Sequence, residues 1–281
     1  METGLRGDRV LITGGAGGIG SAIARTLAEE GAHVAIQYRT SSEAAGRLRD
    51  ELQGTYDVLA PPLPADLRDE LEVERMFEYA LSALERLDGL VVNAGVWPEA
   101  STPIARMSLE QWQDTLAVNL TGAFLCCRAF LRHLEARATQ RPGAPERAVE
   151  RASIVLIGST AGIFGEEGHG DYAASKAALS GLMLTLKNEI VRICPHGRVN
   201  LVNPGWVATP MAEAALEDQE LVARVTSTMA LRKVATADDV ARAVAFLLSD
   251  RLAGHLSGLS LPIAGGMEGR LLHPGSRPSS A

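Results

Sequence analysis

The sequence predicts an α/β fold in which helices cover both faces of one parallel sheet of about seven strands. Short and almost wholly apolar runs alternate along the 281 residues with segments that repeat apolar side chains at helical spacing. Strands that are apolar throughout are typical of a parallel sheet that is buried on both faces. The alternation continues without a Pro-, Gly- or Ser-rich linker, which favours a single doubly wound domain.

The N-terminal unit shows this pattern most clearly. An apolar run at residues 10–12 predicts the first strand, and the glycine-rich segment 14–20 predicts the turn that follows it. Apolar residues from Ile19 to Leu27 then recur at helical spacing, and Gly31 is placed to end that helix.

The later elements follow in the same rhythm. Further apolar runs predict strands at residues 34–36, 58–60, 90–92, 154–157, 199–202 and 259–262. Amphipathic segments predict helices at residues 42–52, 69–84, 172–193 and 237–248, with two more helices within 108–137. We therefore expect one domain that spans residues 1–270.

Two segments depart from the rhythm. Residues 138–151 are polar and rich in arginine, and they predict a loop inserted between a helix and a strand. Residues 271–281 are rich in Pro and Ser, and we expect them to form a flexible tail.

Composition and charge exclude several classes of protein. No run of about 18 apolar residues occurs, so no membrane span is expected, and the N-terminus lacks the pattern of a secretory signal. A net charge of −7 does not suit a nucleic-acid-binding surface. The three cysteines and the His spacing predict neither a disulfide framework nor a metal site. We expect a cytoplasmic globular protein.

The glycine-rich segment is a candidate phosphate-binding loop. Gly14, Gly18 and Gly20 lie where the first strand meets the first helix, and there backbone N–H groups and the helix N-terminus favour an anion. Glycine also permits the close approach of a dinucleotide pyrophosphate. The spacing differs from the general G-x-G-x-x-G fingerprint, so a structural turn is the alternative.

The end of the second predicted strand favours NADP over NAD. An acidic residue at this position suits the ribose hydroxyls of NAD, whereas an arginine suits the 2′-phosphate of NADP. The sequence here has Arg39, Thr40 and Ser41, and no acid before Glu43. An ordinary exposed arginine in a loop is the alternative interpretation.

Tyr172 and Lys176 form a candidate proton-transfer pair. They are four residues apart at the start of a predicted helix, so their side chains share one face. A nearby ammonium favours the phenolate and brings a tyrosine toward the working pH range. Ser159 follows the strand predicted at 154–157, at the sheet edge where ligands bind.

Together these motifs resemble the short-chain dehydrogenase/reductase family over residues 7–266. The motifs are Thr13-Gly14-x-x-x-Gly18-Ile19-Gly20, Asn93-Ala94-Gly95, Asn119, Ser159, Tyr172-x-x-x-Lys176 and Asn203-Pro204-Gly205-x-x-x-Thr209. Within the family the sequence is most similar to the 3-oxoacyl-carrier-protein reductase branch. The resemblance implies a Rossmann fold, a nicotinamide cofactor and a homotetramer.

The resemblance also implies roles for individual residues. Tyr172 would exchange a proton with the substrate oxygen, Lys176 would depress the pKa of Tyr172 and hold the nicotinamide ribose, and Ser159 would position the carbonyl. Asn119 would kink its helix and hold a water that links Lys176 to solvent. The expected cofactor contacts are Gly14, Gly18, Ile19, Gly20, Arg39, Asp66, Leu67, Asn93, Ala94, Gly95, Tyr172, Lys176, Pro204, Gly205, Val207 and Thr209.

These features predict an NADP(H)-dependent oxidoreductase that acts on a ketone or secondary alcohol, or on a 3-oxoacyl thioester. The alternatives are an NAD-dependent dehydrogenase of a small alcohol or sugar, and a protein that senses NADP without turnover. Arg137 and Arg192 are candidate docking sites for an acidic carrier, although the net charge of −7 opposes such a partner. Trp97, Trp206 and residues 161–165 are candidates for the substrate pocket, and His169 is interpreted as a solvated loop residue.

Overall fold

The computed structural model describes residues 2–139, 149–209 and 219–268, and it contains the predicted parallel sheet. Seven strands lie in the order β3-β2-β1-β4-β5-β6-β9, and every neighbouring pair is parallel. They are β1 (Arg9–Ile12), β2 (His33–Tyr38), β3 (Pro62–Pro64), β4 (Gly89–Val92), β5 (Arg151–Ile157), β6 (His196–Pro204) and β9 (Ser260–Ile263). Strand order reverses between β1 and β4, so their carboxyl ends flank the switch point where sheets of this type bind ligands.

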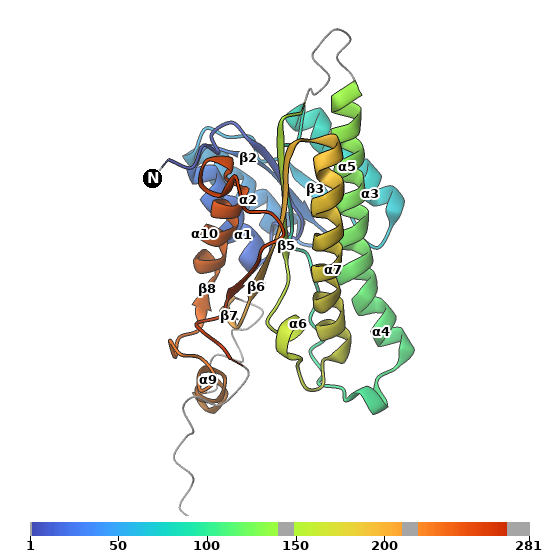
Figure 1. Ribbon diagram of the computed structural model, residues 1–281, viewed down its shortest axis with the longest axis vertical. Helices are drawn as coiled ribbons and strands as arrows, with labels where there is room; N and C mark the ends of the chain where they lie inside the picture. The colour runs from blue at the N-terminus through green and yellow to red at the C-terminus, as the bar shows by residue number, and fades with distance from the viewer. Residues whose placement is uncertain (1, 140–148, 210–218, 269–281) are drawn as a thin grey trace, which may run out of the picture.

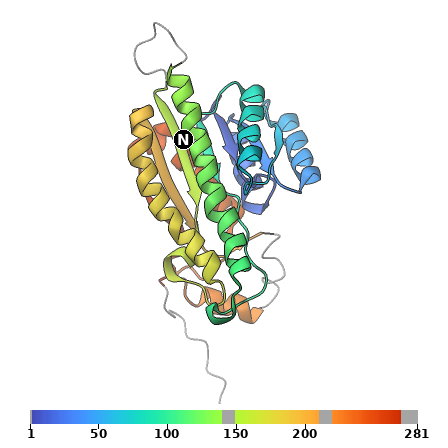
Figure 2. The same ribbon diagram turned by 90° about the vertical axis from the view of Figure 1, so that its right-hand side faces the viewer.

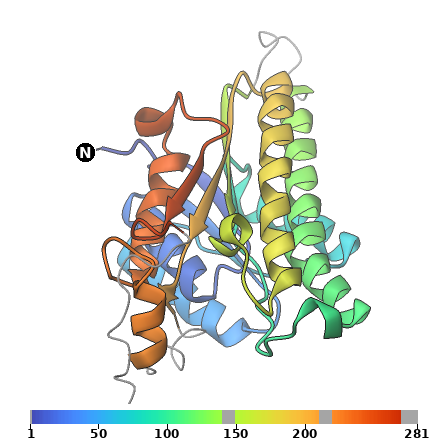
Figure 3. The same ribbon diagram turned by 60° about the horizontal axis from the view of Figure 1, so that its bottom comes forward.

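Helices cover both faces of the sheet (Figures 1, 2 and 3). One face carries α1 (Gly18–Glu29), α2 (Ser42–Thr55) and α10 (Ala237–Leu248). The other carries α3 (Glu70–Leu84), α5 (Gly122–Thr139) and α7 (Gly170–Ile193), with α4 (Leu109–Leu116) leading into α5. The predicted doubly wound fold is therefore confirmed.

Several short elements were not predicted from the sequence. Strands β7 (Val207–Ala208) and β8 (Ala235–Thr236) pair with each other outside the main sheet. The others are the 3-10 turn Ile104–Arg106, α6 (Ala161–Phe164), α9 (Gln219–Thr226) and α11 (Asp250–Ala253). Their length explains the omission, because two to eight residues carry little periodicity.

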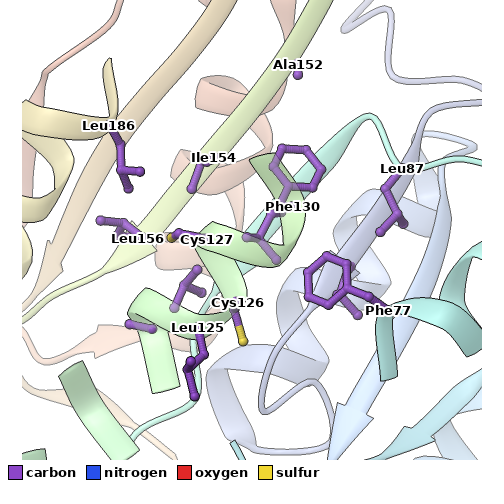
Figure 4. Close-up of a cluster of buried hydrophobic side chains, with 14 of the residues drawn as sticks. Phe77, Leu87, Leu125, Cys126, Cys127, Phe130, Ala152, Ile154, Leu156 and Leu186 are labelled. Atoms are coloured by element: carbon purple, nitrogen blue, oxygen red, sulfur yellow. The ribbon is translucent and has the colours of Figure 1, made fainter. Parts of the chain in front are cut away.

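The hydrophobic core is split by the sheet into two layers. Successive strand residues point to opposite faces, so Leu11 and Leu90 enter one layer while Val10 and Val91 enter the other. Figure 4 shows the first layer around Phe130, which is fully buried. Both faces need apolar side chains, which accounts for the nearly continuous apolar strands in the sequence.

The prediction of the third strand at residues 58–60 is wrong, because β3 begins at Pro62. Val58 and Ala60 are buried, but they lie in the segment that leads into the strand. The carbonyls of Leu59 and Pro61 already accept hydrogen bonds from amides of β2. A strand that contains prolines is tolerated here because β3 lies at the edge of the sheet and needs few amide donors.

The helices predicted within 108–137 form one continuous helical run. A π-helical segment, Ala117–Thr121, joins α4 to α5 and contains Asn119. By length and composition alone, the run Leu109–Thr139 has an 18-residue window apolar enough to cross a membrane, with mean hydropathy 1.2. Side chains such as Phe130 and Leu134 are fully buried against the sheet, so the run also meets the description of a core helix.

Residues 140–148 of the predicted loop and the whole predicted tail 271–281 lie outside the described residues. Of the described residues of the loop, Val149 and Glu150 have no regular structure, and the others belong to its neighbours. Helix α5 continues to Thr139, and β5 begins at Arg151.

Candidate active site

A cavity of about 620 Å³ lies at the carboxyl ends of β1, β4, β5 and β6. It runs from the glycine loop at one end to Tyr172 and Ser159 at the other. Every residue expected from the sequence to contact the cofactor lines this cavity. Asn119 does not line it, because its side chain is buried behind the wall.

The glycine loop places the N-terminus of α1 at the cavity, and an anion can be accommodated there. Gly17 occupies the N-cap position without a side-chain cap, and the first turn of α1 contains no acidic residue. The first backbone N–H groups of that helix therefore have no side-chain acceptor, which suits a phosphate. A side chain at Gly20 is excluded because its Cβ would lie 2.2 Å from the carbonyl oxygen of Gly14.

Two buried polar side chains hold the loop in place. The hydroxyl of Thr13 accepts from the backbone amides of Asn93 and Ala94, at 2.9 and 3.0 Å. The Gln37 side chain accepts from the amide of Gly14 at 2.7 Å and donates to the carbonyl of Ala65 at 2.8 Å. The loop is therefore fixed to the strands β2 and β4 before any ligand binds.

Arg39 and Asp66 lie at the end of the cavity beside β2. Arg39 is exposed and lines the cavity with Thr40 and Ser41. Asp66 is bound in bidentate fashion by Arg68, at 2.5 Å in the shorter contact. The Arg68 guanidinium, and more weakly Arg39, lowers the pKa of Asp66. Arg68 was not singled out in the sequence, and it adds a second cation close to Arg39 in the adjoining groove.

Tyr172 is half-buried at the other end of the cavity, on the first turn of α7. Burial raises the pKa of Tyr172, a hydrogen bond with Ser159 opposes this shift, and the negative charge of Glu166 adds to it. We expected Lys176 to depress the pKa of Tyr172, but burial dominates in the structure. A protonated phenol beside Ser159 is the form that can donate a proton to a carbonyl oxygen.

Lys176 is buried one helical turn beyond Tyr172. Its ammonium lies 5.7 Å from the centroid of the Tyr172 ring and donates to the carbonyl of Ile157 at 2.9 Å. Burial lowers the pKa of Lys176 to about 8. Gly95 lies opposite it, and a Cβ there would be closely packed, at 3.1 Å from Nζ and 3.2 Å from the side-chain oxygen of Asn119. An ammonium has three donors, so bonds to ribose hydroxyls are compatible with the bond to Ile157.

Asn119 connects the loop after β4 to the helix that carries Tyr172. Its side chain accepts from the amide of Val96 at 2.8 Å and donates to the hydroxyl of Ser175 at 3.1 Å. Ser175 in turn donates to the carbonyl of Tyr172 at 2.7 Å. The family resemblance implied a kink at Asn119, and the structure has a π-helical segment at this position.

Two further residues near Tyr172 differ from the sequence analysis: His169 was interpreted as a solvated residue, and Asp171 was not predicted to have a role. His169 is 8% exposed, so its interpretation as a solvated residue is wrong, and its ring stacks on Trp97 at 3.9 Å. Asp171 is fully buried and accepts from Thr115 at 2.8 Å and Gln111 at 3.2 Å, which ties α7 to α4. Neither residue belongs to a motif, and only their position next to Tyr172 pointed to them.

No group of three His, Cys, Asp or Glu side chains that could hold a metal ion occurs among the described residues. The cavity has a glycine-rich helix N-terminus, the Tyr172 phenol and the buried Lys176 ammonium along its lining. This is the equipment that a nicotinamide-dependent oxidoreductase requires of its protein, since the hydride comes from the cofactor.

Comparison with known proteins agrees with this class. Residues 14–268 match a family model described as enoyl-(acyl carrier protein) reductase. The chain is 34% identical to 3beta-hydroxysteroid dehydrogenase 1 of Eggerthella lenta, with 98% of each chain covered. It is also 34% identical to a 3-oxoacyl-acyl-carrier-protein reductase of Aquifex aeolicus, covering 95% of this chain and 100% of that protein.

A solved short-chain dehydrogenase/reductase from Serratia marcescens superposes with a TM-score of 0.81 at 30% identity, covering 93% of this chain and 98% of that one. The chain therefore belongs to the short-chain dehydrogenase/reductase family of oxidoreductases.

Proposed function

We propose that this protein is an NADP(H)-dependent oxidoreductase that interconverts a ketone and a secondary alcohol, with Tyr172 as the proton donor and acceptor. The observation that carries the proposal is the convergence of Ser159, Tyr172 and Lys176 at one end of a cavity whose other end is the glycine loop. A sensor without turnover needs the loop but has no need of a proton donor.

Each polar side chain has a distinct task in the proposed reaction. The cofactor supplies or accepts the hydride when bound. The Ser159 hydroxyl orients the carbonyl oxygen toward Tyr172, whose phenol gives up its proton in reduction. Lys176 holds the ribose. Its ammonium lies next to Gly95, and the loop that contains Gly95 is bound by the Asn119 side chain through the amide of Val96.

The catalytic proposal is tested by Tyr172→Phe. The variant keeps the ring and its packing but removes the proton donor, and we expect kcat with a ketone to fall by about 100-fold or more. Tyr79→Phe is the matched control, because Tyr79 is 62% exposed on α3. Unchanged activity in Tyr172→Phe would show that another group transfers the proton.

For the cofactor, we propose NADP with Arg39 as a ligand of the 2′-phosphate. Arg39 is exposed and lines the cavity beside the hydroxyl side chains of Thr40 and Ser41. Among the described lining residues at this end, the acidic side chain is Asp66, which already forms an ion pair with Arg68. Arg39→Asp is expected to shift the ratio of NADPH to NADH affinity toward NADH by about tenfold or more. Arg75→Asp, at an exposed position outside the cavity, serves as the control. An unchanged ratio would mean that other residues hold the 2′-phosphate or, where the wild type already prefers NADH, that NAD is the cofactor.

For the substrate, we propose a free ketone ahead of an acyl thioester on a carrier. The Eggerthella relative is named a hydroxysteroid dehydrogenase, and the Aquifex relative is named a 3-oxoacyl-acyl-carrier-protein reductase. Arg137 is committed to the fold, since it donates to the carbonyl of Leu87 at 2.7 Å and contacts Asp88 at 3.4 Å. It therefore does not present its charge to an acidic carrier, whereas Arg192 is exposed.

We also propose a cytoplasmic homotetramer. Exposed apolar side chains on α5 and α7, including Phe124, Leu184 and Val191, supply surface for contacts between copies. Light scattering coupled to size-exclusion chromatography is expected to give a mass of about four times 29.8 kDa.

A further inference from the structure

Two charged residues at the β2 end of the cavity, Arg39 and Asp66, are neighbours because of how two strands pair. Strands β2 and β3 are parallel with Tyr38 opposite Pro64, and the amide of Ala65 donates to the carbonyl of Tyr38 at 3.0 Å. Arg39 and Asp66 are the next residues of the two segments, and both line the cavity. Because neighbouring strands are about 4.8 Å apart, the two side chains are within reach of each other.

The carboxylate of Asp66 is nevertheless occupied by Arg68. The Arg68 guanidinium donates to both carboxylate oxygens at 2.5 to 3.0 Å, and the Arg68 amide donates to one of them at 3.0 Å. The Arg39 side chain, in contrast, has no hydrogen bond or ion pair with the residues that the structure describes. Arg68 therefore takes the partner that would otherwise be available to Arg39.

Other carboxylates surround this pair but lie outside the cavity lining. Glu72, at the start of α3, accepts from the backbone amide of Asp66 at 2.6 Å. Glu110 and Asp114 line the adjoining groove with Arg68. Loss of the Arg68 charge would make this end of the site more negative, and an unpaired carboxylate attracts the nearest guanidinium and repels a phosphate.

We propose that Arg68 is a positioning residue that determines the choice of cofactor, because it saturates the Asp66 carboxylate and leaves Arg39 free for the 2′-phosphate of NADP. The inference rests on the proposed function, in which Arg39 is the phosphate ligand. A free guanidinium suits this task because it can bind a phosphate in bidentate fashion. Arg68 acts through Asp66 and Arg39 and not by touching the phosphate itself.

The experiment measures the dissociation constants of NADPH and NADH by the fluorescence of the reduced nicotinamide. These cofactors differ only in the 2′-phosphate, so a contact of Asp66 with any other part of the cofactor cancels in the ratio of the two affinities. Arg68→Gln removes the charge that occupies Asp66, and the double variant Asp66→Asn/Arg68→Gln removes both charges. Arg25→Gln is the matched control, since Arg25 donates to both carboxylate oxygens of Glu51 at 2.6 and 2.8 Å outside the cavity lining.

Arg68→Gln is expected to lower the preference for NADPH over NADH by about fivefold, which corresponds to one partly exposed ion pair. The double variant is expected to restore the preference to within about twofold of the wild type, because the carboxylate that would capture Arg39 is gone. Arg25→Gln is expected to leave the preference unchanged. The inference is overturned if Arg68→Gln leaves the preference intact. It is also overturned if the double variant stays as low as Arg68→Gln, since Arg68 would then bind the phosphate directly.

Arg39→Asp, measured in the same titrations, separates this inference from the proposed function. A wild type that prefers NADPH and loses this preference in Arg39→Asp supports the cofactor proposal, whatever the result for Arg68→Gln. A wild type that prefers NADH overturns both.

Discussion

The buried ammonium of Lys176 is expected to lower the stability of the protein at neutral pH. Only 4% of this side chain is exposed, and burial lowers its pKa from 10.5 to about 8. The perturbation we consider is Lys176→Met, which keeps an unbranched chain of similar length and removes the charge. The variant should lose turnover but gain stability, as is common for residues kept for function.

The size and sign of the effect follow from the lowered pKa. The difference of about 2.5 pH units corresponds to about 3 kcal/mol, at about 1.4 kcal/mol per unit. Loss of the hydrogen bond to Ile157 offsets about 1 kcal/mol, which leaves a net gain of about 2 kcal/mol at pH 7. Between pH 8 and 10.5 the unfolded chain binds more protons at this lysine than the folded chain does. The wild type therefore gains stability with rising pH, and its deficit relative to the variant shrinks.

The assay is urea unfolding of the cofactor-free protein at pH 7 and pH 10, with the free energies of unfolding compared between wild type and variant. Lys233→Met is the control, because Lys233 is 65% exposed. A difference between wild type and Lys176→Met that is the same at both pH values would refute the claim that burial perturbs this lysine.

Two other polar contacts are expected to contribute to the free energy of unfolding. Thr13→Val keeps the shape of the side chain but leaves the half-buried amides of Asn93 and Ala94 without their acceptor, and chemical denaturation should show a loss of about 1–3 kcal/mol. Asp171→Ala removes the acceptor of the buried Thr115 hydroxyl and releases α4 from the start of α7, and the same assay should show a loss of about 1–3 kcal/mol.

The sequence predicts the sheet and the glycine turn between β1 and α1 well because both depend on local patterns. Apolar strands report burial on two faces, and a glycine cluster between a strand and a helix reports a turn that is close to a ligand. The spacing of Tyr172 and Lys176 is likewise local, since one turn of α7 places both on the same face. The carboxyl ends of parallel strands meet at one edge, so Ser159 and Gly14 come to the same cavity.

The features that the sequence did not predict depend on contacts between distant segments. His169 looks like a loop residue until the loop after β4 brings Trp97 against it. Residues 58–60 have a strand-like apolar pattern and the Leu59 carbonyl accepts a hydrogen bond from β2, yet the regular strand register begins at Pro62. Burial alone does not distinguish a strand from the segment that leads into it.

The position of Tyr172 is set mainly by the helix that carries it. On one side Asp171 accepts from Thr115 on α4, and on the other Asn119 reaches Tyr172 through Ser175. Both contacts come from the continuous helical run 109–121, so this run holds the first turn of α7. In the proposed reaction the phenol then needs only the hydrogen bond with Ser159, and its proton stays available for the carbonyl oxygen. A catalytic group held through its backbone in this way can be placed accurately without using the donor that the reaction requires.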